Sequence, residues 1–140
     1  MSTLQFSTTV NASKEKVWET LWNDHTYRQW TSAFHEGSYA ESDWEEGSKI
    51  LFLGPTGDGM FSIIEKKIPN EQMIFKHLGE IKNGVEDAKD WSGAKESYYL
   101  KENNGITTLT VELDAPPDFE SYFNETFPKA LAFLKQLAAQ

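Results

Sequence analysis

The chain lacks cysteine altogether, which excludes disulfide bonds, thiolate nucleophiles and thiolate metal sites. It is also poor in basic residues, since 13 Lys and Arg stand against 22 Asp and Glu and give a net charge of −9. Nucleic acids and anionic membrane surfaces both attract basic patches, so neither is expected as a partner. No apolar run is long enough to span a bilayer, and no secretory signal opens the sequence. These absences predict a cytoplasmic protein.

Aromatic residues, in contrast, are plentiful and make up 14% of the 140 residues. This length suits one domain, residues 1–140, with a single hydrophobic core. So many large rings must pack into that core, line a cavity or form a partner surface.

The spacing of apolar residues predicts a strand and two short helices at the N-terminal end. Residues 4–10 alternate apolar and polar side chains, as in a half-buried strand. Ser13 is a suitable N-cap for a following helix, and Asp24 for a second, shorter helix that carries Trp30. Arg28 on this second helix either holds an anionic ligand group at the mouth of a cavity or is an ordinary exposed side chain.

A run of antiparallel strands follows, because the apolar period changes to two between Ser38 and Leu113. The expected strands are residues 38–42, 49–53, 60–67, 72–80, 94–102 and 107–113. Asn103-Asn104-Gly105 predicts a tight hairpin turn between the last two strands, since Asn and Gly tolerate positive φ. Residues 82–93 show no clear pattern and are the best candidate for a mobile loop.

A long helix is expected at the C-terminal end, with Asp118 as its cap. Its apolar stripe is Phe119, Phe123, Phe127, Leu131 and Leu134. Pro128 lies inside this stretch and cannot donate a backbone hydrogen bond, so a kink or break is expected near Phe127. The helix could cover one face of the sheet and leave a cavity lined by aromatic rings.

Several short segments are similar to those of a known family. They are Ala12-Ser13 before Val17-Trp18, then Tyr27 with Trp30-Thr31, Gly37-Ser38, Ser42-Asp43-Trp44 before Gly47, Pro69–Phe75, Phe127, Leu131 and Leu134-Lys135. With them the chain resembles the helix-grip superfamily (Bet v 1-like, START-like or SRPBCC), and within it the family named after the activator of Hsp90 ATPase. The resemblance implies an α+β fold: a curved antiparallel sheet of six to seven strands, wrapped around a long C-terminal helix, with two short helices after the first strand.

Members of this superfamily bind lipids, hormones or polyketides, and some are cyclases, so the resemblance also implies a ligand cavity between sheet and helix. By this resemblance one face of each strand points into the cavity, and strand alternation and the helical stripe then indicate which side chains lie on that face. The candidate ligand-binding residues are Trp30, Phe52, Phe75, His77, Glu96, Tyr98, Leu109, Val111, Phe127 and Leu131.

His77 and Glu96 are the polar members of this set. They lie on consecutive long strands, which are usually neighbours in an antiparallel sheet. We therefore expect a hydrogen bond between them, direct or through one water, that satisfies the carboxylate and fixes the imidazole tautomer. Two alternatives remain open: His77 as a core residue with another partner, and Glu96 at a strand end open to water.

Three functions fit these observations. The first is binding of a small apolar or amphipathic molecule. The second is a cyclase or hydratase that uses His77, Glu96 or Tyr98 as acid and base. The third is a protein-interaction module resembling the Hsp90 activator, although the activator's separate N-terminal domain has no counterpart in these 140 residues and strong ATPase stimulation is not expected. The histidines are scattered and no phosphate-binding loop is present, so neither a metal nor a cofactor is expected, and both a monomer and a homodimer remain open.

Overall fold

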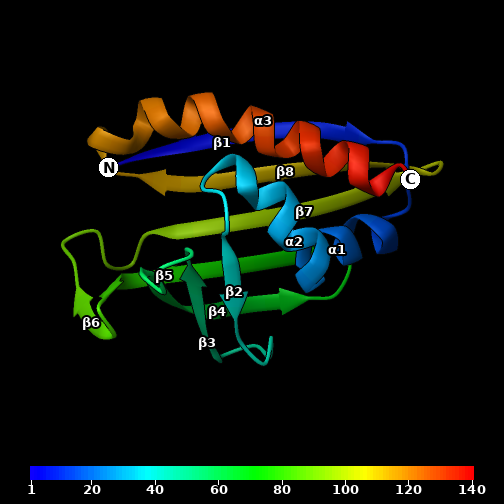
Figure 1. Ribbon diagram of the computed structural model, residues 1–140. Helices are drawn as coiled ribbons and strands as arrows, with labels where there is room; N and C mark the ends of the chain where they lie inside the picture. Colours follow the sequence, from blue (N-terminus) through cyan, green and yellow to red (C-terminus); the bar gives the residue numbers. More distant parts are fainter.

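A single antiparallel sheet forms the frame of the molecule. Figure 1 shows the computed structural model, which describes all residues 1–140. The strands are β1 (Ser2–Val10), β2 (Tyr39–Glu41), β3 (Lys49–Leu53), β4 (Gly59–Ile68), β5 (Gln72–Lys82), β6 (Val85–Ala88), β7 (Lys95–Asn103) and β8 (Ile106–Ala115). They are arranged in the order β1-β8-β7-β5-β4-β3-β2, and β6 pairs with β5 beside this path. The expected sheet of six to seven strands is thus present as a path of seven, with β6 in addition.

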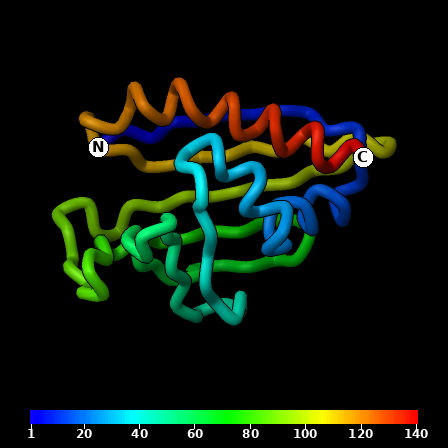
Figure 2. Tube along the Cα trace, in the orientation of Figure 1, coloured from blue at the N-terminus to red at the C-terminus, as the bar shows by residue number.

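The helices pack against this sheet and against one another. They are α1 (Lys14–Trp22), α2 (Asp24–Trp30), the short 3-10 turns η1 (Thr31–Ala33) and η2 (Pro117–Phe119), and the long α3 (Glu120–Ala138). In Figures 1 and 2, α3 runs along β1 and β8, and α1 and α2 lie close to its C-terminal half. This is the helix-grip arrangement that the sequence predicts.

One hydrophobic core of 20 buried residues lies between the sheet and the helices. It includes all six residues for which strand alternation and the helical stripe predict one shared interior: Phe75, Tyr98, Leu109, Val111, Phe127 and Leu131. The alternation is visible in β5 and β8, where every second residue is buried. The period-two pattern therefore oriented these strands correctly.

The tight turn between β7 and β8 is also confirmed. Asn103 pairs with Ile106, which leaves Asn104 and Gly105 as a two-residue loop. Both loop residues have positive φ, 54° and 79°. This is the conformation of a type I′ turn, whose twist matches that of the flanking strands.

Of the three predicted helix caps, Ser13 is confirmed, and Asp24 and Asp118 each lie one residue from the actual N-cap. Asn23 caps α2 through its side-chain oxygen, which accepts from the backbone N–H of His25, and Asp24 is the first helical residue. α3 begins at Glu120, because Pro117 starts a separate 3-10 turn that takes up Asp118. The predictions of Asp24 and Asp118 as caps were wrong because an adjacent residue, Asn23 or Pro117, offers the capping or turn chemistry instead.

α3 also runs without a break through Pro128, where a kink or break was expected. Pro128 and Asn124, whose carbonyl loses its helical donor, both lie on the exposed side of the helix. Water can satisfy that carbonyl, so the cost of the proline is small enough for the helix to continue.

The expected mobile loop at residues 82–93 contains the strand β6, which folds back on the end of β5. Gly79 permits this close approach, because a Cβ atom there would lie 2.2 Å from the backbone oxygen of Asp87. The sequence pattern missed β6 because all four of its residues are exposed and show no apolar alternation.

Candidate functional site

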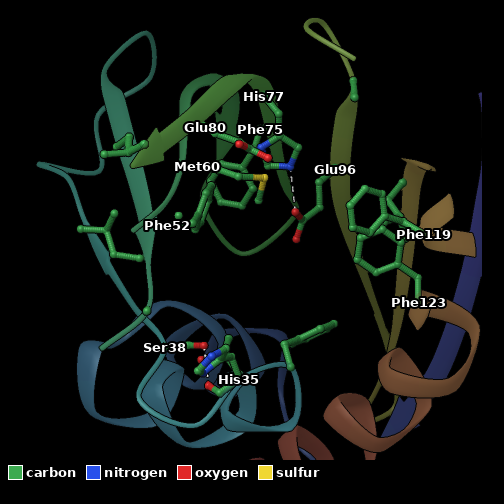
Figure 3. A pocket seen from close by; sticks show the side chains of 18 of the residues that line it. His35, Ser38, Phe52, Met60, Phe75, His77, Glu80, Glu96, Phe119 and Phe123 are labelled. Carbon is green, nitrogen blue, oxygen red and sulfur yellow. Dashed lines mark hydrogen bonds and ion pairs between the residues drawn. The ribbon is translucent and has the colours of Figure 1, made fainter. Parts of the chain in front are cut away.

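A cavity of about 610 Å³ lies between the sheet and the N-terminal end of α3. Strands β3, β4, β5 and β7 form its walls together with α2 and α3. Figure 3 shows Phe52 and Met60 on one side, Phe119 and Phe123 on the other, and His77 near Glu96 between them. Exposed residues such as Thr56, Lys82 and Lys95 surround its opening to solvent, which we call the cavity mouth.

Aromatic rings supply most of the apolar lining. Phe52 contacts Phe75 edge to face, with ring centroids 5.0 Å apart, and also lies 5.8 Å from the imidazole of His77. On the helical side, Phe34 and Phe127 meet edge to face at 4.8 Å. The rings that line the cavity are those of Trp22, Tyr27, Trp30, Phe34, Tyr39, Phe52, Phe75, Trp91, Tyr98, Phe119, Tyr122, Phe123 and Phe127. Such a lining suits a flat apolar molecule.

One chain of hydrogen bonds crosses the cavity wall and joins Ser62, His77, Glu96 and Tyr98. The hydroxyl of Ser62 lies 2.6 Å from Nδ1 of His77, and Nε2 of His77 lies 3.0 Å from Oε1 of Glu96. The phenol of Tyr98 donates to the other carboxylate oxygen, Oε2. The hydrogen bond expected between His77 and Glu96 is therefore present, and it is direct.

Strand register explains why these groups meet. Ser62 on β4 lies directly opposite His77 on β5, and Glu96 on β7 lies opposite Phe75, two residues before His77. Diagonal neighbours on one sheet face are close enough for long side chains to touch. A register shift between Phe61 and Ser62 contributes to the first pairing. This bulge could not be located from the sequence, so the pairing of Ser62 with His77 was not predicted.

The carboxylate of Glu96 sets the tautomer of His77. Because a carboxylate can only accept, Nε2 of His77 carries the proton and donates it to Glu96. In the neutral imidazole Nδ1 then accepts from the hydroxyl of Ser62. Both ring nitrogens are thus engaged within the protein.

Two buried phenols lie close to the same carboxylate. Burial raises the pKa of Tyr98 well above its ordinary value, and the negative charge of Glu96 raises it further. Burial and then the charge of Glu96 likewise raise the pKa of Tyr27. Tyr98 therefore keeps its proton and remains a hydrogen-bond donor to Glu96.

Seven of the ten candidate ligand-binding residues line the cavity: Trp30, Phe52, Phe75, His77, Glu96, Tyr98 and Phe127. The other three, Leu109, Val111 and Leu131, are buried in the core and do not line it. Leu109 and Val111 pair with β1, where α3 packs directly on the sheet. Alternation gives the face of a strand, but it does not show where along that face the helix and the sheet separate.

Arg28 does not line the cavity, although it was considered as a holder of an anionic ligand group. Its guanidinium forms an exposed ion pair with Asp24, with Nε 3.0 Å from Oδ1, and lies over the ring of Tyr39 at 5.0 Å. The alternative, an ordinary exposed side chain, is the one observed.

Several lining residues were not among the candidates, notably Met60, Phe119 and Phe123. Both phenylalanines were assigned to the helical stripe and not to the cavity; Phe123 lies in α3, whereas Phe119 ends η2 and is the N-cap of α3. Ser62, fully buried behind His77, could have been found as a small polar residue in the same alternation as buried Ile64.

No group of three or more His, Asp or Glu side chains lies close enough to hold a metal ion. None of the helices combines the length and the apolar character needed to cross a membrane.

With this geometry established, the chain can be compared with known proteins. The model of the activator of Hsp90 ATPase homolog 1-like family matches residues 11–139. The chain belongs to this family. No curated protein sequence matches it.

Solved structures share the family's fold over nearly the whole chain. The Aha1 dimer from Colwellia psychrerythraea is 22% identical, with a TM-score of 0.78, over 99% of this chain and 97% of that one. Protein MLL2253 from Mesorhizobium loti is 16% identical, with a TM-score of 0.74, over 97% and 96% of the two chains. CalU16 from Micromonospora echinospora is 15% identical, with a TM-score of 0.71, over 98% of this chain and 76% of its own. At these identities the likeness establishes the Bet v 1-like fold and leaves the role of the family member open.

Proposed function

We propose that this family member binds a small hydrophobic or amphipathic molecule in the cavity between the sheet and α3. The proposal rests on one observation. The aromatic-lined cavity of about 610 Å³ contains a polar group, the Glu96 carboxylate, which His77 and Tyr98 hold in place by hydrogen bonds. Typical ligand pockets have volumes of about 300–1,000 Å³ and a few placed polar groups on an apolar lining. The cavity matches both features.

The side chains also favour one orientation of the ligand. Phe52 and Met60 lie across the cavity from Phe119 and Phe123, so an apolar body fits between these two pairs. Glu96 lies between them on the wall and can accept from a polar group of the ligand. Burial of the apolar body would supply most of the affinity, and the carboxylate would fix its direction.

The hydrogen bonds of His77 disfavour this imidazole as a catalytic base. A catalytic base needs an atom that can reach the substrate proton, and both nitrogens of His77 are occupied by Ser62 and Glu96. Ser62 is fully buried and does not line the cavity, so its hydroxyl is not placed as a nucleophile.

The proposal can be tested with the neutral solvatochromic dye Prodan and one variant that fills the cavity. Binding should shift the dye's emission to the blue and raise its intensity, because the dye enters an apolar site. Met60→Trp places a larger ring into the cavity and should weaken binding at least tenfold. Ile106→Trp is the matched control, since Ile106 is exposed at the far hairpin and does not line the cavity.

Equal dye binding by the wild type and both variants would contradict the proposal, as would no binding at all. The Aha1 homologue from Colwellia was solved as a dimer. Light scattering with and without dye therefore belongs to the same experiment, since it gives the number of chains per particle and so converts sites per chain into sites per assembly.

A further inference from the structure

Around Glu96, the cavity wall offers free hydrogen-bond acceptor positions, while the donors of His77 and Tyr98 are used within the protein. We infer that the site selects amphipathic ligands with an O–H or N–H head group and rejects those with a carboxylate or other anionic head. This inference rests on the proposed function and specifies the chemistry of the ligand.

The Glu96 carboxylate is the central acceptor. An ionised carboxylate has about four acceptor positions, and only two are used here, by His77 on Oε1 and by Tyr98 on Oε2. The Glu96 side chain is 20% exposed and that of His77 9%, so Glu96 is the member of the pair that a ligand reaches. A donor on the ligand can therefore add a hydrogen bond without breaking either existing one.

The two groups bonded to Glu96 offer no donor to an anion. His77 gives its Nε2 proton to Glu96, and Tyr98 gives its phenol proton to the same carboxylate. The burial and the negative neighbour that raise the pKa of Tyr98 keep that phenol protonated and donating. Trp22 has a spare indole N–H, but this atom is buried among the rings and does not reach the cavity space.

The charges around the cavity also disfavour an anionic head group. Its lining contains the carboxylates of Asp58, Glu80, Glu96 and Asp114, against the ammonium groups of Lys82 and Lys95. Lys95 lies 3.0 Å from the carboxylate of Glu65 and is already paired. Arg28, which could have attracted an anion, lies outside the lining and pairs with Asp24. An anionic head group would lose its hydration shell and meet a surplus of negative charge.

A series of naphthalenes with one body and different heads tests this directly, by displacement of Prodan at pH 7.5. The compounds are 2-naphthol as donor, 2-methylnaphthalene without a polar head, and 2-naphthoate as anion. One hydrogen bond to a charged acceptor contributes about 1.5–3 kcal/mol, so 2-naphthol should bind about tenfold or more tightly than 2-methylnaphthalene. The anion 2-naphthoate should bind more weakly than either.

Glu96→Gln replaces one acceptor oxygen with an N–H donor and removes the charge. In this variant 2-naphthoate should gain at least tenfold in affinity relative to 2-naphthol. Glu112→Gln on β8 is the matched control, because Glu112 does not line the cavity, and it should keep the wild-type order. Should Glu96→Gln fail to fold, Tyr98→Phe provides a second test. It frees Oε2 from its internal donor, so the advantage of 2-naphthol should persist or grow.

The outcomes separate the two proposals. Equal affinities for all three compounds, or preference for 2-naphthoate, would overturn the selection for donors while ligand binding stands. Failure of Prodan and of every naphthalene to bind would overturn the proposed function itself.

Discussion

The two ends of α3 carry the same kind of apolar stripe but meet the sheet differently. At the C-terminal end, Ala130, Leu131, Leu134 and Ala138 are all buried in the core. At the N-terminal end, Phe119 and Tyr122 remain 46% and 41% exposed and line the cavity with Phe123. The comparison shows that one stripe can both close a core and line a cavity, depending on where the helix and the sheet separate.

Phe127 lies where the two ends meet, and its loss should have the largest effect. It is 2% exposed, stacks on Phe6 at 5.0 Å and meets Phe34 at 4.8 Å. Phe127→Ala should lower the free energy of unfolding by about 3–5 kcal/mol in a denaturant titration, because it removes a buried ring and leaves a void. A loss below about 1 kcal/mol would show that the closely packed C-terminal part of α3 does not extend to this residue.

The next largest effect on stability is expected in the hydrogen-bonded chain of Ser62, His77, Glu96 and Tyr98. Ser62→Ala removes the partner of Nδ1 of His77 in a fully buried place and should cost about 1–3 kcal/mol of stability. Because Ser62 does not line the cavity, Prodan affinity should change little. A large loss of affinity with unchanged stability would place Ser62 in the binding site instead.

The buried phenols predict a loss of stability in alkali. The raised pKa values of Tyr98 and Tyr27 mean that the folded protein keeps protons that the unfolded chain releases above its ordinary tyrosine pKa, about 10. Their contribution is therefore fully present below about pH 10 and declines as the pH rises above it. Between pH 10 and 11.5 the stability of Tyr98→Phe should fall less steeply than that of the wild type, with a slope difference that rises toward about 1.4 kcal/mol per pH unit. Parallel slopes in urea titrations would show that Tyr98 ionises as readily in the folded state.

The smallest effect on stability is expected at the open end of α3. Phe119→Ala makes the same change as Phe127→Ala at an exposed position and should cost less than about 1 kcal/mol. It should nevertheless weaken Prodan binding, since Phe119 forms part of the cavity lining. A stability loss similar to that of Phe127→Ala would remove the distinction between the two ends.

The sequence predicted the parts of this comparison that depend on periodicity. Alternation along residues 72–80 and 107–113 gave the buried face of β5 and β8, and the adjacency of the consecutive long strands β5 and β7 gave the meeting of His77 with Glu96. The family resemblance gave the position of the long helix. These features follow from local patterns that the tertiary structure preserves.

The parts that it did not predict depend on three-dimensional geometry. Leu109 and Leu131 share their faces with cavity residues, and only the curvature of the sheet and the path of α3 place them in the core. The register shift before Ser62 and the pairing of the exposed β6 leave no apolar pattern in the sequence. Both arise from contacts between segments distant in the chain.

The three methionines offer the most direct test of where a ligand lies. Met60 lines the cavity, Met73 is fully buried in the core without lining it, and Met1 is 62% exposed. In a spectrum of protein labelled with ¹³C at the methionine methyl groups, saturating 2-naphthol should shift the Met60 resonance, since naphthalene rings strongly shift nearby methyl signals. The Met73 and Met1 resonances should stay in place. A stationary Met60 signal at a naphthol concentration that displaces Prodan, or a larger shift at Met73, would contradict a ligand site at the open end of α3.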